Sequence, residues 1–188
     1  VKQVMEPGTA SDTSIYQEWL KLVSQKQLNH TLAQSGQAIN LGQGITIEIL
    51  NPPLPPLEGT DDDIDNNGIV LRLTWDRVSF LFTADIEREA ELKLIAQRAN
   101  LRSTVLKVAH HGSQTSTSAE LLVMVDPQIA VISAGKENRF GHPHPEVIER
   151  LKSMLEEDKI YITSEKGTVE FITDGQRLWV QAEEKDSR

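Results

Sequence analysis

Cysteine is absent from all 188 residues, so this chain can form no disulfide, no thiolate zinc site and no cysteine nucleophile. A long apolar run is also missing, because no stretch reaches the roughly 18 residues that a membrane-spanning helix needs. Residues 1–7 have neither a basic start nor an apolar core, which excludes a secretory signal peptide at that place. These absences leave the cellular compartment open.

Positive charge is scarce. The chain has 28 acidic residues against 19 basic ones, a formal net charge of -9. A protein that holds a polyanion by charge neutralisation alone carries the opposite sign. Nucleic acid would therefore have to be held through a metal site or through a local basic strip, for which the candidates are Arg72, Lys107, Lys136 and Arg139.

The composition is that of one globular domain, with 38% hydrophobic and 25% charged residues. Periodicity predicts strands at residues 1–5, 30–32, 45–50, 69–75, 78–82, 104–109, 129–133, 160–163, 168–173 and 177–181. Helices are predicted after an N-cap at Ser11 or Asp12, from about Glu87, from Ser118 to Val125 and from Pro145 to Leu155. The pattern is mixed α and β around one core, and the hairpin of residues 69–82 is apolar enough to be buried on both faces. The acidic stretch 61–68 is predicted to be a solvated loop, with a cation or active-site loop as the alternative.

Polar, ligand-type side chains follow the apolar strands. Asp85 comes after one predicted strand, and His110 and His111 end the next. Four of the five histidines fall within residues 110–144, and imidazole with carboxylate is the ligand set of zinc, manganese or iron. The simpler alternatives are that Asp85 only caps the next helix and that the histidines are structural.

Three segments carry a family resemblance: residues 80–87 (FLFTADIE), residues 105–113 (VLKVAHHGS) and residues 141–145 (GHPHP). They resemble the metallo-β-lactamase-like domain at the C-terminal end of the ComEC family, the competence channel proteins that import DNA. Asn66 and Asn67 fit the Asn-rich entry of that family. The resemblance implies a layered α/β fold, an αββα sandwich, with residues 1–182 as a partial domain and 183–188 as a charged tail.

The same resemblance implies roles for individual residues. Asp85 corresponds to the carboxylate that bridges two metals, and His111 to the final histidine ligand, with His110 as its nearest alternative. Asp85 and His111 are thereby the expected catalytic pair, and Ser113 or Ser116 would accept the other ring N–H of the ligating histidine. The residues expected to contact substrate are Asn67, Lys107, Ser113, Arg139, His142 and His144.

The chain departs from the family in one major respect. The early His-x-His-x-Asp-His cluster is missing, His30 stands alone, and Ala84 replaces the glycine usual before the bridging aspartate. We therefore expect a C-terminal fragment of a longer domain, or else a relic that has lost its site. In the intact domain two divalent ions, zinc or manganese, would support the cleavage of DNA phosphodiesters. For this chain alone we expect weak catalysis or none, and it need not bind a metal.

Two rival functions remain open at this point: a non-catalytic structural or partner-binding module, and a hydrolase of a small phosphate or acyl substrate. The resemblance places the chain in a soluble domain of a bacterial inner-membrane protein, on a side that the sequence leaves open. The expected partners are DNA, the remainder of the parent channel protein, and a second copy bound through exposed sheet surface.

Overall fold

The computed structural model describes residues 1–9 and 11–183, so all but the first residue of the expected tail at 183–188 lies outside the described residues. The strands are β1 (Gln3–Glu6), β2 (Asn29–Leu32), β3 (Ala38–Gly42), β4 (Ile45–Asn51), β5 (Val70–Trp75), β6 (Val78–Phe82), β7 (Val105–Lys107), β8 (Ile129–Ile132), β9 (Ile160–Ile162), β10 (Val169–Thr173) and β11 (Leu178–Ala182). The α-helices are α1 (Ser14–Gln25), α2 (Asp63–Asn66), α3 (Arg88–Ala96), α4 (Ala119–Val125), α5 (Pro145–Lys152) and α6 (Thr163–Lys166). Short 3₁₀ turns form η1 (Ala109–Gly112) and η2 (Glu157–Lys159).

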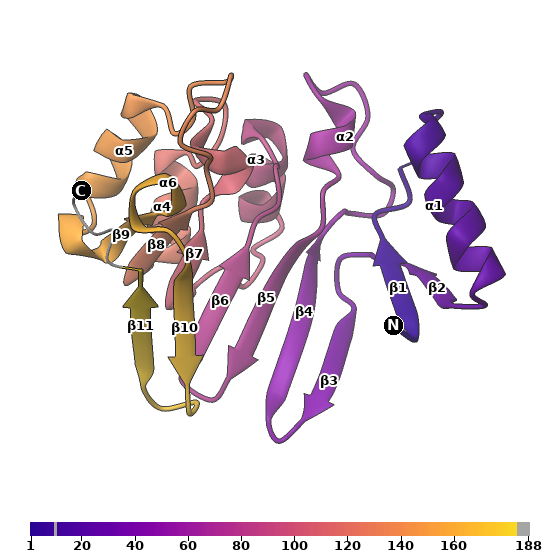
Figure 1. Cartoon of the computed structure of the whole chain (residues 1–188), viewed down its shortest axis with the longest axis horizontal. Coiled ribbons are helices and arrows are strands. Elements are labelled where there is room, and N and C mark those ends of the chain that lie inside the picture. The colour runs from indigo at the N-terminus through magenta and orange to yellow at the C-terminus, as the bar shows by residue number, and fades with distance from the viewer. Residues whose placement is uncertain (10, 184–188) are drawn as a thin grey trace.

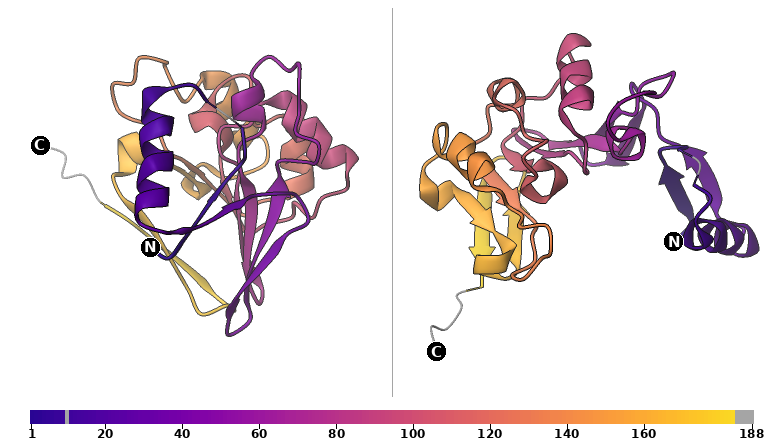
Figure 2. Two further views of the ribbon diagram at one scale, coloured as in Figure 1. Left: turned by 90° about the vertical axis from the view of Figure 1, so that its right-hand side faces the viewer. Right: turned by 90° about the horizontal axis from the view of Figure 1, so that it is seen from above.

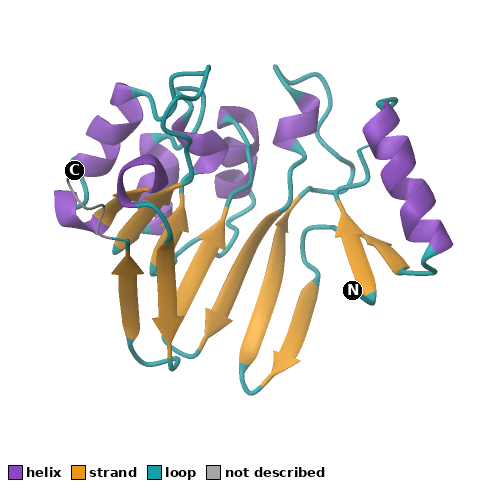
Figure 3. Cartoon of the chain, in the orientation of Figure 1, coloured by secondary structure: helices purple, strands orange, loops and turns teal. Residues whose placement is uncertain are grey.

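One mixed sheet organises the molecule (Figure 1). Its seven strands lie in the order β3-β4-β5-β6-β7-β8-β9 within the described part of the chain. The pairs from β3 to β6 are antiparallel, and those from β6 to β9 are parallel. The helices gather towards one end of the strands (Figure 3). The predicted layered mixture of α and β is confirmed.

The main core lies between the sheet and the helices. Leu81, Leu106 and Ala130 are paired neighbours in β6, β7 and β8, and all three are buried. Helices α3, α4 and α5 supply the opposing apolar side chains, which include Leu94, Leu121, Leu122, Val125, Val147 and Leu151. Burying one such side chain contributes about 1.5–3 kcal/mol, so this layer fixes the strands that lead into the site.

The other face of the sheet is only partly covered. Seen from above, α3 and the hairpin β10–β11 lie on opposite sides of the sheet (Figure 2). The ring centroids of Phe171 and Phe80 are 5.8 Å apart, yet Phe82 remains 40% exposed. A cavity of about 650 Å³ opens there between the sheet and β10. The prediction that residues 69–82 are buried on both faces is therefore wrong for this face.

Several boundaries differ from those predicted. Helix α1 is capped by Thr13, whose side chain accepts the N–H of Tyr16, so the expected cap at Ser11 or Asp12 is wrong by one or two residues. The acidic stretch is not a plain loop, because Asp62 caps the short helix α2. Strand β7 ends early, where the backbone turns into η1. Among the described residues, no helix combines the length and the apolar character needed to cross a membrane.

Candidate functional site

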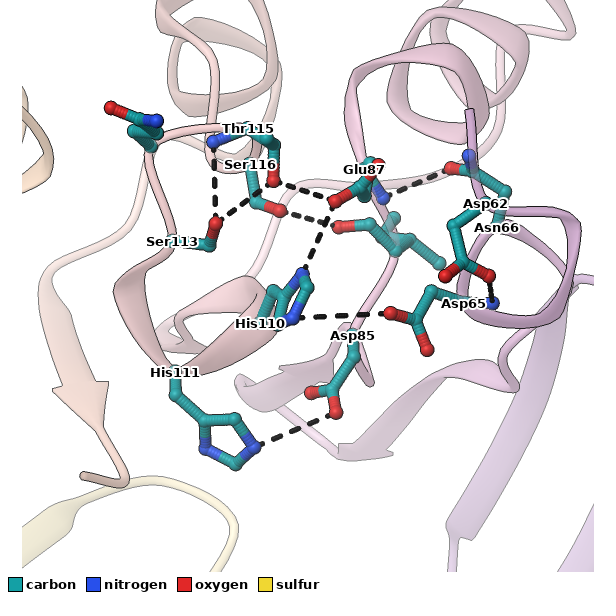
Figure 4. A network of polar contacts seen from close by, with 12 residues as sticks. Asp62, Asp65, Asn66, Asp85, Glu87, His110, His111, Ser113, Thr115 and Ser116 are labelled. Atoms are coloured by element: carbon teal, nitrogen blue, oxygen red, sulfur yellow. Dashed lines mark hydrogen bonds and ion pairs between the residues drawn. The ribbon is translucent and has the colours of Figure 1, made fainter. Parts of the chain in front are cut away.

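The polar residues after the strands meet at one edge of the sheet. Strands β6, β7 and β8 are parallel neighbours, so their carboxyl ends open on the same side. Asp85 follows β6, and His110 and His111 lie in η1 after β7 (Figure 4). The loop after β8 brings His142, whose ring centroid lies 5.6 Å from that of His110. The sheet thus gathers residues that are up to about 60 positions apart in the sequence.

Asp85 and His111 face each other. The Nε2 atom of His111 lies 3.5 Å from Oδ2 of Asp85, and both side chains are partly exposed, at 45% and 40%. The Nδ1 atom of His111 lies 2.6 Å from the carbonyl oxygen of Ser133. Because a carbonyl can only accept, Nδ1 is the donor in this contact, and in the neutral tautomer that it selects the lone pair is on Nε2, the atom that faces Asp85.

The acceptor that orients His111 differs from the one expected. Ser113 Oγ lies 2.9 Å from the hydroxyl of Thr115, and the hydroxyl of Ser116 donates to the carbonyl of Ile86. Neither serine reaches the ring, so the expectation of Ser113 or Ser116 as its partner is wrong. The ring is oriented instead by the backbone carbonyl of Ser133, the residue directly after β8. A backbone carbonyl cannot be predicted from a pattern of side chains.

His110 is turned towards a different set of carboxylates. Its Nδ1 lies 3.5 Å from Oε1 of Glu87, and its Nε2 lies 3.9 Å from Oδ2 of Asp65. The divergence comes from the backbone, because both histidines have positive φ, 45° for His110 and 54° for His111. Two consecutive non-glycine residues in the left-handed region of backbone conformation cost free energy, and they persist only where the surrounding structure holds them there.

Gly112 explains how the histidine turn reaches the loop after β8. Its φ is +83°, and a Cβ there would lie 2.6 Å from the Cβ of Pro143. Its carbonyl also accepts the N–H of His144 at 2.9 Å. Only glycine permits both this backbone conformation and the close approach to Pro143. Gly112 therefore brings the turn with His110 and His111 against the loop with His142 and His144.

His142 and Lys107 have altered acidities. Burial, followed by the repulsion of His144 and His110, lowers the pKa of His142, so its ring is neutral at neutral pH. Burial also lowers the pKa of Lys107, against the attraction of Asp85. The Nζ of Lys107 lies 3.8 Å from Oδ1 of Asp85, so this lysine balances the charge of a site carboxylate.

Two of the residues expected to contact substrate, Asn67 and Ser113, are buried. Asn67 is 1% exposed, and its side chain accepts the N–H of Leu57 and donates to the carbonyls of Leu57 and Asp63. Ser113 is 6% exposed. Both side chains make hydrogen bonds within the chain in this structure, and a substrate contact by either one stays a prediction.

Sequence reasoning missed four residues of this edge: Asp65, Glu87, Ser133 and Phe140. The acidic stretch carried a signal for Asp65, since a cation loop was its alternative reading. Glu87 is tied into the site by Thr115, whose hydroxyl donates to its Oε1 at 2.7 Å (Figure 4). Its own N–H donates to Oδ1 of Asn66 at 3.0 Å, which links the site to α2.

The Asp85–His111 pair meets part of what a metal site requires. Two ligands of one tetrahedral zinc ion lie about 3.4 Å apart, which matches the 3.5 Å between Nε2 and Oδ2. A ligating histidine also donates its other N–H to an acceptor, as His111 does to Ser133. However, residues 1–9 and 11–183 contain no group of three or more His, Asp or Glu side chains that could hold a metal ion. The described residues therefore offer two possible ligands at this place, fewer than a metal site takes from protein.

No protein-family model matches the chain. Curated bacterial proteins do. The chain is 32% identical over 127 residues, 68% of its length, to ComE operon protein 3 of Bacillus subtilis. It is 35% identical over 113 residues, 58% of its length, to competence protein ComA of Neisseria gonorrhoeae. It is 39% identical over 110 residues, also 58% of its length, to recombination protein 2 of Haemophilus influenzae.

The chain is thus a homologue of the competence proteins of the ComEC family, and the resemblance seen in the sequence motifs is confirmed. It spans only 13–16% of the lengths of these relatives.

Proposed function

We propose that this chain is part of a bacterial DNA-uptake protein of the competence type, and that its site belongs to a metal-dependent phosphodiesterase domain acting on DNA. The observation that carries the proposal is the Asp85–His111 pair, 3.5 Å apart, with His111 oriented by the Ser133 carbonyl. The named competence homologues support a competence-related role. That the parent is an inner-membrane protein with this domain outside the bilayer is part of the proposal.

The residues at this edge have separate tasks in the proposed reaction. Asp85 and His111 would hold a divalent ion, zinc or manganese, together with ligands from outside the described residues. When bound, such an ion lowers the pKa of its water to about 7 and stabilises charge on a phosphoryl oxygen. His142, neutral at neutral pH, lines the same pocket as His111, and the guanidinium of the exposed Arg139 lies over the ring of Phe140, which also lines that pocket; both would orient the phosphodiester. Lys107 balances the charge of Asp85.

One observation favours a second candidate, a non-catalytic partner-binding module of the same protein. The part of the chain that the structure describes offers two adjacent ligands, whereas catalytic zinc sites take three from protein. Metal binding separates the two candidates.

Asp85→Asn is expected to weaken zinc or manganese binding by about tenfold or more, because the amide removes one of the two charged or basic donors. Isothermal titration of the chain with each metal, with metal content checked by elemental mass spectrometry, measures this. Asp126→Asn is the matched control, since Asp126 is an exposed partner of Arg102 away from the site. If the unsubstituted chain binds no metal, or if Asp85→Asn binds zinc and manganese with the same affinity as the unsubstituted chain, the non-catalytic module is favoured.

A further inference from the structure

A pocket of about 430 Å³ opens beside the Asp85–His111 pair. His111, Asn138, Phe140 and His142 are among its lining residues. Its volume lies within the range of about 300–1,000 Å³ that is typical of small-ligand sites. None of the functions proposed above uses Phe140, although its side chain is 61% exposed at this pocket.

The ring of Phe140 already has planar groups around it. The ring of His142 is stacked with it, with centroids 5.6 Å apart and an angle of 22° between the planes. The guanidinium carbon of Arg139 lies over the ring, 4.8 Å from its centroid. Because the guanidinium is planar and belongs to an exposed side chain, it occupies a position that another planar group can take.

The loop that carries Phe140 is held in place from within. Asn138 donates to the carbonyls of Gly135 and His142, at 2.8 and 2.6 Å, and accepts the N–H of His142 at 2.9 Å. These bonds close the loop behind the aromatic ring. An exposed ring on a preorganised loop loses little entropy when it binds, which suits it to stacking.

We infer that Phe140 is a stacking platform for an unpaired nucleobase of single-stranded DNA, next to the reactive site. The inference rests on the proposed function and adds its substrate class. Exposed aromatic rings beside a cation are the usual means of holding single strands, since every base offers a π-face. A base would replace Arg139 over the ring, and the guanidinium would turn to the adjoining phosphate. Duplex DNA keeps its bases stacked on one another and cannot use this platform.

The charge of the chain agrees with stacking as the main contribution. With a net charge of -9, overall electrostatic attraction to DNA is absent. Lys136 and Arg139 are exposed in the same loop, with Glu137 between them, so the local positive charge is small. Binding should therefore depend on the ring more than on salt.

The test is fluorescence anisotropy of a labelled oligothymidylate of about ten nucleotides, a length that suits single-strand sites, titrated with the chain in EDTA. Phe140→Ala is expected to weaken binding by about tenfold, and Phe140→Trp to retain it, because one stacked base accounts for this much. Trp179→Ala is the matched control, since Trp179 is an aromatic residue on β11 that is 45% exposed. The duplex of the same length is expected to bind more weakly.

Equal binding by Phe140→Ala and the parent, or equal loss in Trp179→Ala, would overturn the inference, as would equal binding of the duplex. EDTA excludes metal and cleavage, so this result is independent of the metal titration. Loss of metal binding in Asp85→Asn with unchanged DNA binding in Phe140→Ala would leave the proposed function in place and remove only the platform. Unchanged metal binding in Asp85→Asn together with weakened DNA binding in Phe140→Ala would keep the single-strand binding site and remove the metal centre.

Discussion

Glu91→Gln is expected to lower the free energy of unfolding by about 3 kcal/mol, because it removes one acceptor of a buried pair of hydrogen bonds and leaves an N–H unsatisfied. Glu91 lies in α3 and is fully buried. Its two carboxyl oxygens accept the backbone N–H groups of Thr117 and Ser118, which come directly before α4. Glutamine has one accepting oxygen, so its NH₂ group would face an N–H donor and leave that donor unsatisfied.

Urea unfolding followed by circular dichroism measures the effect. Glu149→Gln is the matched control, because Glu149 is an exposed residue of α5 and should change stability by less than about 0.5 kcal/mol. An equally stable Glu91→Gln would show that the carboxylate is not needed to hold the start of α4. Loss of these bonds would also loosen the segment 113–118 next to the site, because Thr115 in that segment donates a hydrogen bond to Glu87.

The same substitution has a pH dependence of defined sign. Burial is the largest influence on Glu91 and raises its pKa above the ordinary 4.5, against the N–H donors that lower it. The folded state therefore holds the proton more tightly than the unfolded state, and this contribution to stability falls as pH rises above 4.5. A protonated carboxyl still accepts through both oxygens, whereas the amide cannot. The deficit of Glu91→Gln is thus expected to be larger at about pH 5 than at about pH 8.

The sequence predicted the framework of the site because strand ends follow a general rule. Asp85 and His111 follow two strands whose apolar runs were clear, and parallel neighbours bring their carboxyl ends together. The opposite directions of His110 and His111 could not be predicted, since they result from two left-handed backbone conformations. The partner of His111 was equally hidden, because a backbone carbonyl has no residue type.

The remaining errors also have physical causes. Phe82 was expected to be buried because its strand is apolar on both faces, but periodicity does not say whether another element covers a face. Strand β3 (Ala38–Gly42) was missed because its sequence, AINLG, combines three apolar side chains with asparagine and glycine and does not alternate regularly. Thr13 caps α1, whereas Ser11 and Asp12 offered the same chemistry one or two residues earlier.

Asn67→Asp is expected to lower the free energy of unfolding by about 3 kcal/mol, although the two side chains have the same shape. The NH₂ group of Asn67 donates to the carbonyls of Leu57 and Asp63, at 2.8 and 2.7 Å. A carboxylate keeps the acceptor for the N–H of Leu57 but directs negative charge at two carbonyl oxygens. The position is 1% exposed, so water cannot relieve the repulsion.

Thermal unfolding across a range of pH distinguishes this electrostatic cause from a general loss of packing. The introduced carboxyl would have a raised pKa, since burial and the facing carbonyls both disfavour its charged form. Its deficit should therefore shrink as pH falls to about 5 and the group takes up a proton, which one carbonyl can accept. Asn100→Asp, at an exposed position, is the control and should show neither effect. A deficit in Asn67→Asp that does not change with pH would assign the loss to packing instead. A deficit that does shrink would show that Asn67 acts as the donor that ties Leu57 to α2, the helix that carries Asp65, and hence to His110.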